Sequence, residues 1–93
     1  MKLRYGRGAL ADLEEIFAYI ARDNREAAAR LVARIEEAAD RIAERPYIGE
    51  ATRKSRFRRF PVGSYLIVYE VGRDEVVIHY VRHGALRRPW EWE

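Results

Sequence analysis

The sequence contains no cysteine, which excludes disulfide bonds and thiolate metal sites. Histidine occurs only at positions 79 and 83, and two imidazoles are too few for a metal cluster. There is no P-loop, dinucleotide fingerprint, Ser nucleophile elbow or zinc-ligand spacing, so nucleophilic catalysis and nucleotide cofactors are not expected. We therefore expect no metal and no other cofactor, and stability that comes from packing or from a partner.

Long apolar runs and linkers are missing as well. The basic first seven residues are followed by no uninterrupted apolar stretch of signal-peptide or membrane-spanning length. The expected location is the cytoplasm, without membrane association. A chain of 93 residues buries only about 60 to 65% of its unfolded surface, which predicts one core and a single domain over residues 1–93.

Charge is unevenly placed within the net value of +3. Residues 1–50 carry nine basic and ten acidic side chains, whereas residues 51–93 carry nine basic and five acidic ones, a net charge of −1 against +4. Sixteen of the eighteen cations are Arg, whose planar fork suits carboxylates, phosphates and stacked bases. This bias has two explanations, a binding role for the second half or GC-rich coding without functional meaning.

The chain opens with a strand pattern and continues with a helical one. Alternation of Leu3 and Tyr5 with basic residues predicts a short strand, closed by a turn at residues 6–8. Apolar residues between positions 9 and 21 recur at helical spacing, which predicts an amphipathic helix.

A second helix is predicted to begin after an N-cap in residues 23–26, because Glu26 follows Asp23 by three positions as in a capping box. It should end near Arg45, since Pro46 disfavours helix in the residue before it. So short a connection folds the two helices back on each other as an αα-hairpin.

The apolar period changes from 3.6 to 2 after Gly49. Segments 57–60, 65–71 and 75–81 are rich in β-branched and aromatic residues and are separated by hairpin-length turns. They predict a three-stranded antiparallel meander, which the first strand joins. The expected fold is α+β with the order β-α-α-β-β-β, an antiparallel helical hairpin packed on a small antiparallel sheet.

The densest chemical feature is residues 53–59, where five cations surround an aromatic residue. The cations are Arg53, Lys54, Arg56, Arg58 and Arg59. Strand alternation would place Arg56 and Arg58 on one face, where their guanidinium groups would attract a polyanion. The alternative interpretation is a solvated edge strand whose charges prevent edge-to-edge aggregation.

His83 stands at the end of the last predicted strand. One interpretation makes it a general acid or base at neutral pH, and the other gives it a local hydrogen bond that orders the strand end. His79 lies inside the strand and is predicted to pack. The tail adds Trp90 and Trp92, which dock either on the domain's own sheet or at an interface, where Trp and Arg are frequent anchors.

Five sequence pieces occur in a characteristic order and spacing. They are Ala9-x-x-Asp12-Leu13-x-x-Ile16-x-x-Tyr19-Ile20, an Ala-rich second helix, Arg45-Pro46-x-x-Gly49, Gly63-Ser64-Tyr65-Leu66-Ile67-Val68-Tyr69 and Val77-Ile78-x-x-Val81-x-His83-Gly84-Ala85. Together they resemble the ParE/RelE toxin superfamily over nearly the whole chain, and the His-Gly-Ala ending is more similar to ParE than to RelE members. The resemblance implies a bacterial toxin of a type II toxin–antitoxin, or plasmid stabilisation, system, with a ParD-like antitoxin encoded alongside.

The resemblance implies two modes of poisoning. ParE members are taken to bind DNA gyrase so that DNA breaks accumulate, without bond chemistry of their own. The target contacts implied here are then Arg56, Arg58, Arg59, Arg82, His83, Arg87, Arg88 and Trp90. RelE members cut mRNA in the ribosomal A site, and the catalytic residues implied here are then Lys54, Arg56, Arg59, Arg82 and His83. Gyrase poisoning is our first hypothesis, a ribosome-dependent RNase the second, and a protein that has lost its toxicity the third.

The tail departs from both patterns. It lacks the Tyr that RelE-like chains carry soon after the His position, and both Leu86 and the ending Trp90-Glu91-Trp92 differ from the commoner ParE ending.

An antitoxin is also favoured by packing. A helical hairpin on a four-stranded sheet leaves apolar surface open, which a partner helix or an added strand would cover. An acidic antitoxin tail would neutralise the basic half. We therefore expect a hetero-oligomer in which the first helix and the basic sheet hold the antitoxin, with Leu13, Ile16, Phe17, Ile20, Arg53 and Arg58 as contacts.

Overall fold

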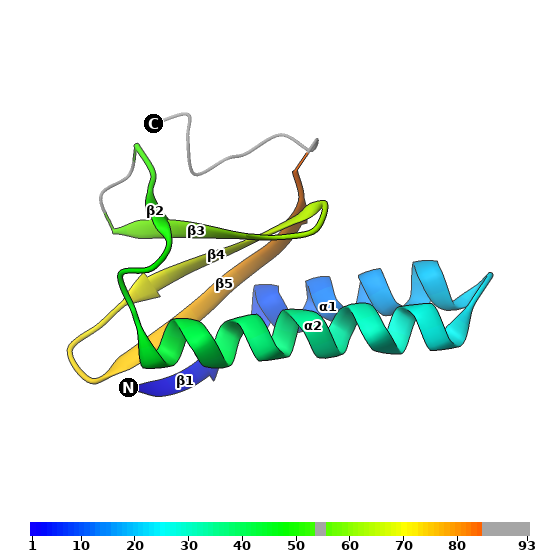
Figure 1. The fold of residues 1–93 in the computed structure, drawn as a ribbon, viewed down its shortest axis with the longest axis horizontal. Coiled ribbons are helices and arrows are strands. Elements are labelled where there is room, and N and C mark those ends of the chain that lie inside the picture. Colours follow the sequence, from blue (N-terminus) through cyan, green and yellow to red (C-terminus); the bar gives the residue numbers. More distant parts are fainter. Residues whose placement is uncertain (54–55, 85–93) are drawn as a thin grey trace.

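The computed structural model describes residues 1–53 and 56–84, and these contain two helices and five strands. The strands are β1 (Lys2–Tyr5), β2 (Glu50–Ala51), β3 (Phe57–Val62), β4 (Tyr65–Val71) and β5 (Glu75–His83), and the helices are α1 (Arg7–Ala21) and α2 (Arg25–Glu44). The two helices form a hairpin that packs against the sheet (Figure 1). The α+β class is as predicted, and the two-residue strand β2 is additional.

The sheet has the strand order β1-β5-β4-β3-β2. β3, β4 and β5 form the predicted antiparallel meander, and β2 pairs with β3 in the antiparallel sense. β1 runs parallel to β5, however, so the sheet is mixed and not wholly antiparallel as expected. Alternation in the sequence predicts a strand, but it says nothing about the direction of a partner at the other end of the chain.

The predicted turn at residues 6–8 is instead the start of α1, with Gly6 as its N-cap. The Gly6 amide donates to the Ile78 carbonyl at 2.8 Å, so β1 passes directly into the helix beside β5. A Cβ atom on Gly8 would lie 2.9 Å from the His79 carbonyl oxygen. Gly8 is therefore explained by the close approach of α1 to β5, and not by a turn.

α2 begins one residue later than the capping-box prediction. The N-cap is Asn24, whose Oδ1 accepts a hydrogen bond from the Ala27 amide at 3.0 Å, and not Asp23. The helix ends at Glu44, as expected from Pro46. Its buried residues are Ala28, Ile35, Ala38, Ala39, Ile42 and Ala43. Neither described helix has the length and apolar content needed to cross a bilayer.

Tyr69 is the largest fully buried side chain among the described residues, and its hydroxyl ties a loop to the core. The hydroxyl accepts from the Gly49 amide at 2.9 Å and donates to the Pro46 carbonyl at 2.8 Å. Burial of the phenol raises the pKa of Tyr69. The segment between α2 and β2 is thereby held against β4.

A register shift in β5 changes which side chains share a face. Opposite Val68 and Tyr69 of β4 the partners are Tyr80 and Ile78, so His79 is an extra residue. His79 contacts the ring of Phe57. Phe57, Val68 and Tyr80 form a second small hydrophobic cluster apart from the main core. His83 instead contacts Tyr65, which packs on the main core between sheet and helices. The two His therefore lie on opposite faces, although an even number of positions separates them.

Candidate functional site

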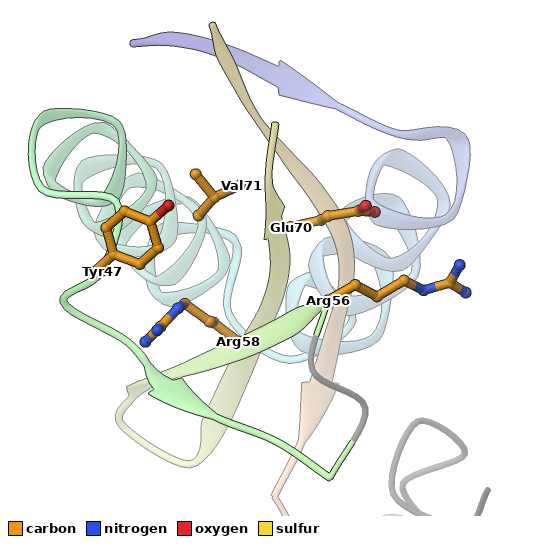
Figure 2. A pocket seen from close by; sticks show the side chains of 5 residues that line it. All are labelled: Tyr47, Arg56, Arg58, Glu70 and Val71. Carbon is orange, nitrogen blue, oxygen red and sulfur yellow. The ribbon is translucent and has the colours of Figure 1, made fainter. Parts of the chain in front are cut away.

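Two residues of the predicted basic run line a pocket of 190 Å³ at the start of β3. We call it the arginine pocket, and it is lined by Tyr47, Arg56, Arg58, Glu70 and Val71 (Figure 2). Two guanidinium groups and one carboxylate at its wall suit an anionic or carboxylate-bearing ligand.

The two Arg of this pocket do not share one face. Arg58 donates from Nη1 to the Gly49 carbonyl at 2.6 Å, and its guanidinium lies 4.8 Å from the centre of the Tyr47 ring. Arg56 precedes β3 and lies over the ring of Phe57 at 4.7 Å. Figure 2 shows the two side chains extending in different directions. Alternation therefore misplaces Arg56, because this residue stands outside the strand.

The other cations of the basic run differ in their contacts and exposure. Arg59 forms an ion pair with Glu50 of β2 at 2.9 Å between Nη2 and Oε1. Arg53 is exposed. Lys54 lies outside the described residues.

Arg82 of β5 is held by an acidic residue of α1. Its Nε lies 3.2 Å from Oδ2 of Asp12, which also accepts from the Val81 amide at 2.9 Å. The guanidinium lies 5.1 Å from the centre of the Tyr80 ring. Asp12 thus ties α1 to the edge of β5 beyond the end of β1, a role that its place in an amphipathic helix did not indicate.

His83 lies on the helix side of the sheet, beside Tyr65 at 5.4 Å between ring centres. The ring borders a groove between α1 and the sheet that is lined by Glu15, Ile16, Tyr19, Tyr65 and His83. The predicted contacts Arg87, Arg88 and Trp90 lie outside the described residues. Neighbouring residues of a strand point to opposite faces, so Arg82 and His83 are not brought together.

One polar pair was not predicted as a site. His79 Nε2 lies 2.9 Å from Oε1 of Glu70, and both side chains are about one-third exposed, at 33% and 39%. Phe57 meets the His79 ring at 5.3 Å, nearly edge to face. The sequence predicted His79 to pack, which the Phe57 contact confirms, but the pairing with Glu70 follows from the register shift.

α1 is flanked by a second and larger groove. The α1–α2 groove has a volume of 410 Å³ and is lined by Leu10, Leu13, Glu14, Phe17, Val32 and Glu36. Of the helix residues predicted to hold an antitoxin, Leu13 and Phe17 line this groove, whereas Ile16 lines the groove toward the sheet. Ile20 is half-buried. The predicted contacts are thus divided between the two sides of α1.

The sequence of residues 3–86 matches the family described as the ParE toxin of the type II toxin–antitoxin system parDE. The chain belongs to the ParE toxin family. A relative in Sinorhizobium fredii, Y4kP, which is named as a candidate toxin, is 40% identical over 90 residues that cover 95% of this chain and 93% of that protein.

Two solved structures share the ParE-family fold. A chain of the chromosomal ParDE system of P. aeruginosa has a TM-score of 0.76 and covers 89% of this chain and 95% of its own. A chain of the RelBE2 toxin–antitoxin complex of Mycobacterium tuberculosis has a TM-score of 0.70, with 88% and 95% covered. Both are 22% identical to this chain, so the likeness concerns the fold.

Proposed function

We propose that this ParE-family toxin acts by binding DNA gyrase and that a ParD-like antitoxin neutralises it. The observation that carries the choice of a binding poison over a nuclease is the separation of the RNase candidates. Arg82 and His83 lie on opposite faces of β5, and Arg56 lies at the start of β3. Acid–base cleavage needs groups within hydrogen-bond reach of one reacting phosphate. Strand alternation directs Arg82 and His83 away from each other, which favours a binding role.

The binding surface proposed for gyrase is the arginine pocket with the neighbouring Arg59. Arg56 is exposed and has the Phe57 ring as its contact, so its charge faces solvent. Arg59 is only 23% exposed and is paired with Glu50, so it contributes less free charge. Arg82, His83, Arg87, Arg88 and Trp90 remain predicted contacts.

Two observations support an antitoxin partner. Apolar residues along α1 are exposed, and the structural neighbours come from toxin–antitoxin systems. The neighbours come from a ParDE system and from a RelBE2 toxin–antitoxin complex, as their names state. Leu10 of α1 is 51% exposed and Tyr19 is 71% exposed. Leu10 and Tyr19 line different grooves and so offer apolar contact area to a partner on either side of α1.

One observation favours the RNase alternative. The His79–Glu70 pair lies beside Phe57, over which Arg56 stacks, and a His–carboxylate pair next to a cation suits proton transfer from a ribose hydroxyl. If this alternative holds, the unaltered chain cuts cellular mRNA, and His79→Gln abolishes both the cutting and the toxicity.

The deciding experiment is induction of the chain in bacterial cells that lack the antitoxin. We expect chromosome breaks and a DNA damage response, with cellular mRNA of full length. Truncated mRNA with intact chromosomes would overturn the proposal.

Arg56→Glu should lower toxicity at least tenfold, because it reverses the exposed charge of the arginine pocket. Arg73→Glu, in the exposed turn between β4 and β5, is the matched control and should stay toxic.

A further inference from the structure

The loop between α2 and β2 presents apolar side chains to solvent. Tyr47 is 68% exposed, and its neighbour Ile48 is 39% exposed. Among the exposed large apolar residues in the described ranges 1–53 and 56–84, these two are the only pair that is adjacent in the sequence. The functional residues predicted from the sequence included neither of them. We call residues 45–49 the Tyr47 loop.

Four hydrogen bonds fix the Tyr47 loop to itself and to the sheet. Two join backbone groups of the loop to the buried Tyr69 hydroxyl, at 2.9 and 2.8 Å. A third closes a turn from the Ile48 amide to the Arg45 carbonyl at 3.0 Å, and the fourth is donated by Nη1 of Arg58 at 2.6 Å. A loop that is already fixed loses little conformational freedom when a partner binds, which lowers the entropic cost of association.

Tyr47 and Arg58 form one side of the arginine pocket. The Arg58 guanidinium lies 4.8 Å from the centre of the Tyr47 ring, and Val71 also lines the pocket (Figure 2). Arg58 has no carboxylate partner among the residues that the structure describes. Tyr and Arg are residue types that often dominate the energy of an interface. An aromatic ring beside an available guanidinium suits a segment that carries a carboxylate next to an apolar side chain.

Arg56 and Glu70 form the other side of the pocket. Arg56 is exposed, and Figure 2 shows its side chain extending away from Arg58. The Glu70 carboxylate lies 2.9 Å from Nε2 of His79 and so already has a partner. A charge at the rim of an interface mainly speeds the encounter with an oppositely charged partner, whereas a well-packed anchor mainly slows its release. The two sides of the pocket therefore suit different roles.

We propose that the Tyr47 loop anchors gyrase by taking an acidic segment of gyrase in which an apolar side chain stands next to the carboxylate. The carboxylate meets Arg58, and the apolar side chain packs on Tyr47 and Ile48. Arg56 attracts the segment toward this site without anchoring it. The inference rests on the proposed function, because it assigns separate roles within the surface proposed for gyrase.

A second copy of the chain is a poorer occupant of this surface. A two-fold contact places the same patch on both subunits, so Arg56 and Arg58 would face the same cations of the other copy. Like charges placed opposite each other oppose association. A partner with a carboxylate at this point has the complementary charge.

The test measures the binding of the purified chain to immobilised gyrase by surface plasmon resonance. Tyr47→Ala should raise the dissociation rate constant about tenfold with little change in the association rate constant, because the anchor is lost while the charge is kept. Tyr47→Phe keeps the ring and should keep both rate constants. Arg56→Gln should instead lower the association rate constant and weaken its dependence on salt.

Two further variants complete the test. Ile48→Ser changes a second exposed side chain of the Tyr47 loop and should also raise the dissociation rate constant, so the result does not depend on the folding of one variant. Arg22→Gln is the control for charge, because Arg22 is exposed at the end of α1. The 20 residues of α2, about 30 Å of helix, separate it from the Tyr47 loop. This control should bind gyrase as the unaltered chain does.

A dissociation rate constant that neither Tyr47→Ala nor Ile48→Ser changes would overturn the inference, while binding to gyrase would leave the proposed function standing. If Tyr47→Ala weakens binding to the antitoxin and not to gyrase, the antitoxin is the occupant and the inference is wrong. If the unaltered chain does not bind gyrase, the proposed function fails together with the inference, and this is seen before any variant is measured.

Discussion

At the scale of single residues, Tyr69 joins the core to the loop between α2 and β2. Its ring is fully buried in the main core. Its hydroxyl accepts a hydrogen bond from the Gly49 amide and donates one to the Pro46 carbonyl, both in the loop between α2 and β2. A Cβ on Gly49 would collide with this hydroxyl and would lie 2.8 Å from the Arg59 carbonyl oxygen. Gly49 is therefore required by a close approach that only the folded chain creates.

Tyr69→Phe removes both hydrogen bonds while it keeps the ring. The Gly49 amide and the Pro46 carbonyl then lose their partner, and a buried polar group without a partner costs about 1 to 3 kcal/mol. We expect the free energy of unfolding in urea to fall by about that amount. Tyr47→Phe, whose ring is exposed, is the control and should change it by less than about 0.5 kcal/mol. Equal effects of the two changes would contradict this role of the Tyr69 hydroxyl.

Tyr5 makes the stability of the fold sensitive to alkali. Its pKa is raised to about 12 in the folded chain, above its value of about 10 in an unfolded chain. Between these values the unfolded chain loses the phenol proton and the folded chain keeps it. The contribution of Tyr5 is thus complete below about pH 10 and is lost as the pH rises through about 12.

Tyr5→Phe should therefore flatten the fall in unfolding free energy above pH 10. The measurement is a series of urea titrations from pH 8 to 12 on both chains. Curves that stay parallel over the whole range would rule out a Tyr5 contribution, since the variant has no phenol proton to lose at this position.

At the scale of elements, the two helices owe their boundaries to different causes. α1 starts at Arg7 after the N-cap Gly6, which makes no side-chain cap, and the start follows from the passage of the chain from β1 along β5. α2 starts at Arg25 after the N-cap Asn24, whose side chain accepts a hydrogen bond from the Ala27 amide. The first boundary is fixed by tertiary contacts, and the second by a local hydrogen bond.

The α2 cap can be tested with two neighbouring residues. Asn24→Ala removes the observed cap and should cost about 1 kcal/mol of unfolding free energy. Asp23→Ala removes the residue that the capping-box pattern pointed to, yet it should have little effect because α2 begins after Asn24. Thermal unfolding followed by circular dichroism measures both. A larger loss for the Asp23 variant would show that the cap in solution is the one that the sequence predicted.

At the scale of the whole molecule, charge is sorted over distinct surfaces. Carboxylates border the α1–α2 groove, whereas Arg56 and Arg58 border the pocket at the start of β3. The sequence already showed a balanced first half and a basic second half. The first half builds the helical hairpin and β1, whereas the second half builds β3, β4 and β5. The proposed partners follow from this division.

The amino-acid sequence by itself determined the features that depend on near neighbours. These include the helical hairpin, the end of α2 before Pro46 and the three-strand meander, because helix period, strand alternation and turn residues act over a few positions. The family was indicated by the order and spacing of five pieces along the chain. It also located the basic segment around β3. Hydrophobic patterning indicated that a helix or strand forms there, but not which elements contact one another.

Only the tertiary structure decided the features that join distant residues. It set β1 parallel to β5, and the register shift at His79 placed the two His on opposite faces and brought His79 to Glu70. It also directed the side chains of Arg56 and Arg58 apart and placed Arg82 in an ion pair with Asp12. The physical reason is that strand direction, register and side-chain pairing between distant residues depend on how the whole core packs.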